Sequence, residues 1–265
     1  LSYGMEQLKG MIFPLLAEVL RADGVRIDGI YERNDEALRA KEGLQQNKGW
    51  YPLPGEQHPD STCTEICENG VYYHVAFESG QKTGFFLDQK SNRRAVARLA
   101  AGHTVLDCFT HTGSFALHAG HYGAKEVIGV DISQYACDCA TENAKLNGLE
   151  DRVRFECANA FDYLHAAQDA HEQFDVVILD PPAFTKARRT AENAMRGYKE
   201  INYRAMKLLP RGGYLATASC SHFAGEEMFI KMLRSAARDA NRQLRQIEVK
   251  QQGPDHPILW GVDET

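Results

Sequence analysis

The chain has 265 residues, of which 43% are hydrophobic and 25% are charged, and a formal net charge of −6 at pH 7. This length and composition predict a globular protein with one larger and one smaller domain. The negative charge argues against a protein that coats nucleic acid through its overall field. No apolar run reaches the ~18 residues needed to span a bilayer, and the first 20 residues lack the layout of a signal peptide, so we expect a soluble, cytoplasmic protein.

The cysteines predict neither a disulfide framework nor a metal site. There are seven of them, an odd and scattered set, and two lie inside apolar runs typical of strands. Cys63-x3-Cys67 and Cys137-x-Cys139 each lack a second pair at zinc spacing. We therefore expect reduced thiols and no bound metal.

Residues 1–90 are predicted to form a small α+β domain. The periodicity of residues 5–21 is helical, and residues 24–31 have the composition of a strand. Residues 50–59 are rich in Pro and Gly and are expected to form an exposed loop. Asn69-Gly70 separates two β-rich runs, which is a strong signal for a hairpin.

Residues 91–265 are predicted to form an α/β domain. After a basic helix, five strand-like runs each precede a helix-like run, which predicts a doubly wound, Rossmann-like parallel sheet with helices on both faces. The runs are TVLDCF, EVIGVDIS, VRFECANA, FDVVILD and GGYLATASC. Ligands of such sheets bind outside the carboxyl ends of the strands, so the residues after each strand are the candidates for a site.

The first strand ends in Asp107 and is followed by a single glycine, Gly113. A dinucleotide site would show G-x-G-x-x-G here, so a nicotinamide dehydrogenase is disfavoured. A carboxylate can accept hydrogen bonds from an ammonium group, and Gly113 allows a close approach of the backbone. This pattern favours a nucleoside that carries an amino acid.

The next two strands end in residues suited to the rest of such a ligand. Asp131 stands where a carboxylate can hold both ribose hydroxyls, Ile132 can pack on adenine, and Asn159 can bind an adenine edge. Each has a structural alternative: Asp107 and Asp131 as helix N-caps, and Asn159 as a turn former.

The fourth strand ends in Asp180-Pro181-Pro182-Ala183-Phe184. Prolines cannot join a sheet ladder, so pairing should stop here and a stiff turn should begin. We interpret this turn as the catalytic edge, where Phe184 stacks on a flipped base, or alternatively packs into the core. Residues 185–211 then carry eight basic and two acidic side chains, which form either a phosphate-binding surface or a solvated helix face.

The fifth strand ends in Cys220, just before a helix. A helix N-terminus, with help from His222, favours the thiolate needed for nucleophilic attack. The structural alternative is a small buried hydrophobic side chain.

Taken together, GFFLDQKSNR, VLDCFTHTGSFALHA, VIGVDIS, ILDPPAFTK, RGYKEIN, SCSH and DHPILWG resemble class I S-adenosylmethionine (SAM)-dependent methyltransferases, and more closely the bacterial enzymes that form 5-methylcytosine in 23S rRNA. The resemblance covers nearly the whole chain. It implies SAM as cofactor, 23S rRNA as partner, Cys220 as the nucleophile that adds to cytosine C6, and residues 1–90 as the RNA-side domain. It also implies an N-terminal PUA domain and a last strand that this sequence lacks, so we expect a fragment. A homodimer is a further partner that the sequence allows.

The resemblance also implies the residues of the site. Asp180 is the candidate acceptor of the C5 proton, while Phe86 and Asp88 would form part of the active-site lip. The cofactor would be bound by Asp107, Phe109, Thr110, Gly113, Ser114, Asp131, Ile132, Asn159, Ala160 and Asp180. The substrate would be bound by Pro181, Phe184, Lys186, Arg196, Tyr198, Gln89 and Arg93.

Other functions stay open at this point. An RNA guanine N-methyltransferase on the same fold also suits the Asp-Pro-Pro turn and needs no covalent step, so Cys220 is the discriminating residue. A methyltransferase of a small molecule or a protein is disfavoured by the basic run. A module that binds cofactor or RNA without catalysis is the non-enzyme alternative.

Overall fold

The computed structural model describes residues 2–34, 38–55, 57–80, 82–184, 191–221 and 225–261. By its contacts the chain divides into two compact units. The first unit comprises Leu1–Glu65 and His74–Phe86, and the second comprises Ile66–Tyr73 and Leu87–Thr265. None of the helices in the described part of the chain is long and apolar enough to cross a membrane.

The first unit pairs one long helix with a short antiparallel sheet. Helix α1 spans Tyr3–Ala22 and α2 spans Leu38–Lys41, while β1 (Ile30–Asn34) pairs with β2 (Asn47–Tyr51). The strand predicted at residues 24–31 begins only at residue 30. Ile30 pairs with Tyr51, and β2 ends there, so the residues before Ile30 have no partner in β2. The prediction of a loop from residue 50 was wrong for Trp50 and Tyr51, which belong to β2.

The predicted hairpin is present. Strands β3 (Cys63–Glu68) and β4 (Val71–Ala76) pair across Asn69 and Gly70, whose φ angles of 52° and 87° are those of a type I′ turn. The tip of the hairpin, Ile66–Tyr73, belongs to the second unit.

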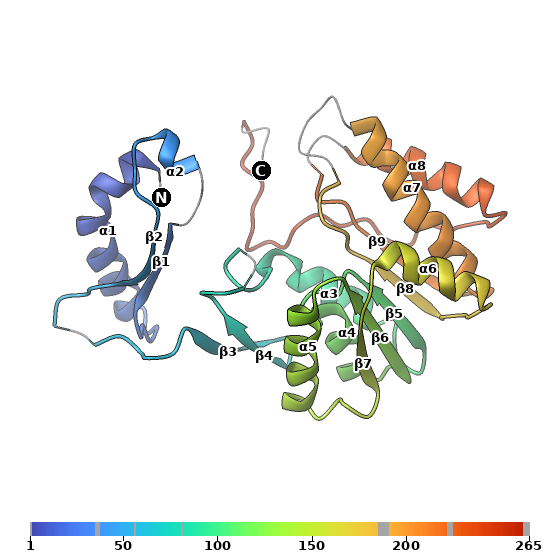
Figure 1. Cartoon of the computed structure of the whole chain (residues 1–265), viewed down its shortest axis with the longest axis horizontal. Coiled ribbons are helices and arrows are strands. Elements are labelled where there is room, and N and C mark those ends of the chain that lie inside the picture. The colour runs from blue at the N-terminus through green and yellow to red at the C-terminus, as the bar shows by residue number, and fades with distance from the viewer. Residues whose placement is uncertain are drawn as a thin grey trace. The chain divides into compact units, whose positions relative to one another are not determined.

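The second unit is built on a five-stranded parallel sheet in the order β7-β6-β5-β8-β9, which confirms the predicted α/β fold (Figure 1). The strands are β5 (Thr104–Cys108), β6 (Glu126–Asp131), β7 (Val153–Cys157), β8 (Val176–Leu179) and β9 (Tyr214–Thr217). The strand order reverses direction between β5 and β8, so ligands are expected at the carboxyl ends of these two strands.

Helices cover both faces of this sheet (Figure 1). A short helix η1 (Leu87–Gln89) leads into α3 (Lys90–Ala97), which packs on α4 (Ser114–His121). Helices α4 and α5 (Gln134–Leu146) lie on one face. Helices α6 (Ala160–Asp169), α7 (Ala191–Leu208) and α8 (Glu226–Asp239) pack together over the other.

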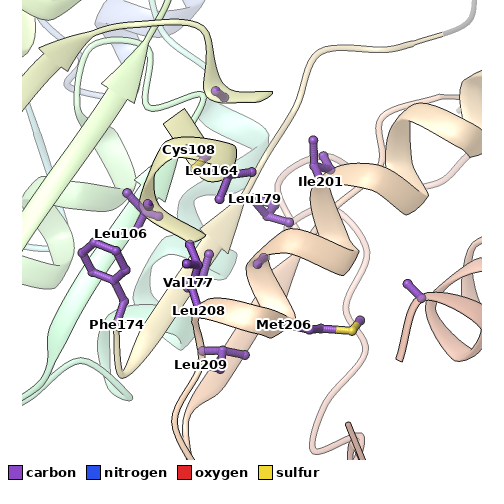
Figure 2. Close-up of a cluster of buried hydrophobic side chains, with 14 of the residues drawn as sticks. Leu106, Cys108, Leu164, Phe174, Val177, Leu179, Ile201, Met206, Leu208 and Leu209 are labelled. Carbon is purple, nitrogen blue, oxygen red and sulfur yellow. The ribbon is translucent and has the colours of Figure 1, made fainter. Parts of the chain in front are cut away.

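The main hydrophobic core lies between the sheet and the layer of α6, α7 and α8 (Figure 2). Leu106 and Cys108 of β5 point into it, together with Val177 and Leu179 of β8. Side chains alternate across a strand, so Asp107, between two core residues, points to the face covered by α4. The core thus fixes β5 and β8 and determines the direction of the acidic side chain at the end of β5.

Candidate active site

The loop of residues 109–113, which we call the β5 loop, has a constrained backbone. Phe109, His111 and Gly113 have φ angles of 66°, 52° and 85°, a region in which non-glycine residues are uncommon. A Cβ atom on Gly113 would lie 2.8 Å from the ring of Phe155, so only glycine fits here without displacement of that ring. The Thr110 N–H donates to the Val130 carbonyl at 3.0 Å and ties the loop to β6.

Asp107 is fully buried beneath this loop. Its Oδ2 accepts hydrogen bonds from Thr110 Oγ1 at 2.6 Å and from the Ala116 N–H at 3.0 Å. Its Oδ1 has no partner among the described residues. Burial raises the pKa of Asp107 to about 7, against the lowering effect of the Thr110 hydrogen bond, and the negative charge of Asp180 raises it further. The N-cap alternative holds in part, because Ala116 lies in the first turn of α4, but Oδ1 still lacks a donor.

Asp131 holds two neighbouring turns. One carboxylate oxygen accepts from the His111 N–H at 2.9 Å and the other accepts from the Ser133 N–H at 3.0 Å. The N-cap of α5 is Ser133 rather than Asp131, because Ser133 Oγ accepts from the Ala136 N–H. The adjacent Ile132 is 71% exposed at the end of β6, in the position expected of a residue that packs on a ring.

Asn159 is the N-cap of α6, and its Oδ1 accepts from the Phe161 N–H at 2.9 Å. Its local role is therefore that of a helix cap, where the structural alternative was a turn former. Its side chain is exposed next to the buried Ala160, so the amide group still lies at the carboxyl edge of the sheet.

The Asp-Pro-Pro turn, Asp180–Pro182, follows β8 directly. Asp180 is partly exposed, and desolvation raises the pKa of its carboxyl to about 6, while the charge of Arg93 opposes the shift and that of Asp88 adds to it. A carboxyl with this pKa is ionised at neutral pH and can accept a proton.

Cys220 and the Asp-Pro-Pro turn are brought together. The Cys220 thiol donates a hydrogen bond to the Pro181 carbonyl, with 3.7 Å between Sγ and the oxygen. Cys220 is exposed, which rules out its structural alternative as a buried hydrophobic side chain. The next residue, Ser221, is buried, and its Oγ lies 2.8 Å from the hydroxyl of Tyr198. A thiol that solvent can reach thus stands beside the backbone of the turn.

Phe184 and Tyr198 lie under the turn. Their ring centroids are 4.6 Å apart, and Phe184 also contacts Phe161 at 5.9 Å. Tyr198 has no exposed surface, whereas Phe184 is partly exposed at the margin of the core. Tyr198 is therefore buried against Phe184 and Ser221 instead of presenting its side chain to a ligand.

Arg93 is also buried, with an exposed fraction of 1%. Its Nη1 donates to Glu68 Oε1 at 2.7 Å, so a side chain at the hairpin tip holds this guanidinium. The same tip contributes Tyr73, whose hydroxyl lies 2.8 Å from Nδ1 of the buried His118 in α4. Burial lowers the pKa of His118 to about 4, so this imidazole is neutral, and the charge of Arg93 supports the neutral form.

The remaining predicted substrate residues have other contacts or lie outside the described residues. Arg196 is exposed on α7, and Gln89 accepts a hydrogen bond from Asn92 at 2.8 Å. Within the basic run, Lys199 pairs with Asp239 of α8 and Arg204 pairs with Glu200 in its own helix. These two cations contribute to helix packing and to a helix face. Lys186 and His222 lie outside the described residues.

Sequence reasoning missed three contributors to the site: His111, Glu68 and His118. The His111 backbone N–H binds Asp131 from a neighbouring strand end, and nothing in the local pattern indicates a backbone contact of this kind. Glu68 and His118 belong to a buried polar network whose members are far apart in the chain. An acid at the tip of a predicted hairpin was the one available signal.

Comparisons with known proteins show the family to which the chain belongs. The sequence profile of the S-adenosylmethionine-dependent methyltransferase family matches residues 52–262. The chain is 44% identical over 230 residues to ribosomal RNA large subunit methyltransferase I of Aeromonas salmonicida, which covers 86% of this chain and 57% of that protein. It is 42% identical over 260 residues to the protein of the same name from Vibrio parahaemolyticus, with 97% of this chain and 63% of the relative covered. The chain therefore spans about six-tenths of the length of these curated relatives.

Solved structures show the same fold at lower identity. A protein of Streptococcus mutans described as a SAM-dependent methyltransferase superposes with a TM-score of 0.76 at 22% identity, over 96% of this chain and 62% of that one. A methyltransferase designated SMU.776, solved in complex with SAH, superposes with a TM-score of 0.79 at 22% identity, over 98% and 63%. With the profile match over residues 52–262, the chain belongs to the S-adenosylmethionine-dependent methyltransferase family.

Proposed function

We propose that this chain methylates C5 of a cytosine in large-subunit ribosomal RNA, through a covalent bond between Cys220 and C6 of the base. The names of the curated relatives support the class of substrate. The contact that carries the choice of base and mechanism is the one between the Cys220 thiol and the Pro181 carbonyl. A methyltransferase of a ring or exocyclic nitrogen needs no thiol at this position.

The residues at the carboxyl edge fit SAM. Asp107 has an acceptor oxygen to which no described residue donates, as expected of a carboxylate that binds the ammonium group of an amino acid. Asp131 offers a carboxylate for ribose hydroxyls, and the exposed Ile132 offers an apolar surface for adenine. Phe109, Thr110, Gly113 and Ser114 would enclose the methionine end, and Asn159 and Ala160 the adenine end. When bound, the cofactor supplies a methyl group on a positively charged sulfur.

Cytosine C5 is a poor nucleophile until the ring is activated. Addition of the Cys220 thiolate to C6 forms a C–S bond and places the electron pair of an enamine on C5. C5 then takes the methyl group as the bond from methyl to sulfur breaks. The Asp180 carboxylate accepts the C5 proton, the C5–C6 double bond re-forms, and the thiolate leaves. Each step uses a group at the ends of β8 and β9.

The substrate residues act in two ways in this proposal. Pro181 and Phe184 shape the edge on which the target base lies, while Lys186, Arg196 and Gln89 contact RNA. Tyr198 and Arg93, both buried, act as positioning residues. Tyr198 holds Ser221 beside Cys220, and Arg93 sets the charge around Asp180.

The test is transfer of labelled methyl groups from SAM to protein-free 23S rRNA, with mass spectrometry of the product nucleosides. We expect 5-methylcytidine. Methylguanosine would contradict the assignment of the base. Binding of SAM without any methyl transfer would show that the chain is a binding module and not an enzyme of this kind.

A further inference from the structure

The first unit contains a cavity that the proposed function does not use. Its volume is about 450 Å³, within the ~300–1,000 Å³ typical of ligand sites. It is lined by Phe13 of α1, by residues of β1, and by Phe77 and Thr83 of the segment after β4. The lining residues of β1 are Tyr31, Glu32, Arg33 and Asn34. All of these lining residues belong to the first unit, whereas Cys220 belongs to the second.

Aromatic rings form the apolar part of this cavity, and other aromatic residues of the same unit pack against them. Tyr31 and Phe77 meet at 5.1 Å between ring centroids, and Trp50, outside the lining, contacts both at 5.2 and 5.5 Å. Phe13 is held in the same way by Tyr51, at 4.8 Å. Rings that are fixed before binding lose little conformational freedom when a planar ligand stacks on them.

A buried carboxylate forms the polar part. Glu32 is 8% exposed, and its oxygens accept hydrogen bonds from Lys9 Nζ at 3.1 Å and from Asn34 Nδ2 at 2.7 Å. A carboxylate has about four acceptor positions, so Glu32 keeps the capacity to accept from a ligand. A carboxylate accepts hydrogen bonds and cannot donate them, so Glu32 favours an N–H donor on the ligand. Arg33, also in the lining, donates to the carbonyls of Gly80 and Lys82.

We propose that this cavity binds a single unstacked base of the RNA, one with an exocyclic amino group such as cytosine. RNA-binding proteins read unpaired bases by stacking them on aromatic rings and bonding their edges, and a carboxylate accepts from the amino group of cytosine. The proposal rests on the proposed function, because an RNA substrate supplies such a base. This base is distinct from the one that Cys220 attacks, and it anchors the RNA while the target base is methylated.

The test compares variants of the whole chain. We would measure the affinity of Tyr31→Leu and Glu32→Gln for short fluorescent oligocytidylate and oligouridylate. We expect Tyr31→Leu to weaken both by about fivefold or more, because it removes a stacking ring. Glu32→Gln should reduce the preference for cytidine over uridine, because uracil has no amino group at this edge. Tyr3→Leu and Glu18→Gln change exposed side chains of the same unit outside the cavity and serve as matched controls.

Methyl transfer by the same variants separates this proposal from the proposed function. If the wild-type chain methylates rRNA while both variants bind and react with RNA as it does, the cavity proposal is wrong and the function stands. If the wild type methylates no RNA, the function itself fails. The variants could instead lose activity on a ribosomal particle while their affinity for naked RNA is unchanged. That result would mean that the cavity binds a side chain of a ribosomal protein, and it would also overturn the proposal. Phe13→Leu replaces Tyr31→Leu if the latter does not fold.

Discussion

At the scale of single residues, the chemistry depends on charge buried at the ends of β5 and β8. Asp107 and Asp180 both have a raised pKa, about 7 and about 6, because each has lost much of its solvent. A ligand that carries an ammonium and a sulfonium group would favour the carboxylate form of both residues. Asp107 and Asp180, the two acids that the sequence analysis selected, should therefore be ionised more fully when the cofactor is bound.

We expect Asp180 to set the acidic limb of the pH profile of kcat. The carboxylate is the form that accepts a proton, so kcat should rise with pH and then level off. The pKa of Asp180 is about 6 without ligand, and the bound cofactor favours the carboxylate, so this rise should lie below pH 6. Asp180→Asn should lower kcat by about a hundredfold or more and abolish this limb. Asp88→Asn removes a negative charge that raises the pKa of Asp180, so it should move the limb to lower pH. A limb that stays in place in Asp88→Asn would show that another group titrates.

At the scale of elements, the β5 loop and the hairpin tip hold the site in place. The loop combines three positive φ angles with a tie to β6, and the tip inserts Glu68 and Tyr73 beside α3 and α4. Local sequence predicted both elements, since Gly113 follows a strand and Asn69-Gly70 is a turn signal. It could not predict their partners, because Phe155, Arg93 and His118 reach them only through the fold.

Gly113 in the β5 loop and Gly102, which precedes β5, together separate the backbone role of a glycine from its packing role. Gly113→Ala and Gly102→Ala both place alanine at positive φ, but only the Cβ at 113 meets other atoms, at 2.8 Å from Phe155 and 3.1 Å from Ala140. We expect Gly102→Ala to cost about 1–2 kcal/mol of unfolding free energy and Gly113→Ala to cost more and to weaken SAM binding. Urea unfolding and calorimetric titration with SAM measure the two effects. Equal losses of unfolding free energy in the two variants would show that packing at Gly113 contributes little to stability.

The ion pair at the hairpin tip should stabilise the second unit far more than a surface pair does. The side chains of Arg93 and Glu68 are 2% and 4% exposed, whereas those of Arg154 and Glu126 are 52% and 49% exposed. Loss of one charge from a buried ion pair is far more costly than loss from an exposed pair, so Glu68→Gln should cost about 3 kcal/mol. Glu126→Gln should cost less than about 1 kcal/mol. Comparable values from urea unfolding would mean that Arg93 finds another partner when Glu68 is changed.

At the scale of the whole molecule, the sequence predicted the five βα units and the parallel sheet that they form. This worked because strand and helix periodicities are local and parallel strands present their carboxyl ends together. It failed for β2, where Trp50 and Tyr51 lie in a Pro- and Gly-rich stretch but pair with β1. It also assigned substrate contact to Tyr198 and Arg93, whose burial follows from packing between elements distant in sequence.

The central claim is that Cys220 attacks the base beside the Asp-Pro-Pro turn, and its most direct test is to trap the adduct. RNA that carries 5-fluorocytidine lacks the C5 proton that must leave after methyl transfer, so the thiolate cannot be released and the enzyme should stay bound covalently to the methylated base. We expect wild-type protein with SAM to form a complex that survives denaturation and carries the RNA on Cys220, while Cys220→Ala binds SAM but forms no complex. Methylation of cytosine at a normal rate by Cys220→Ala would contradict the account.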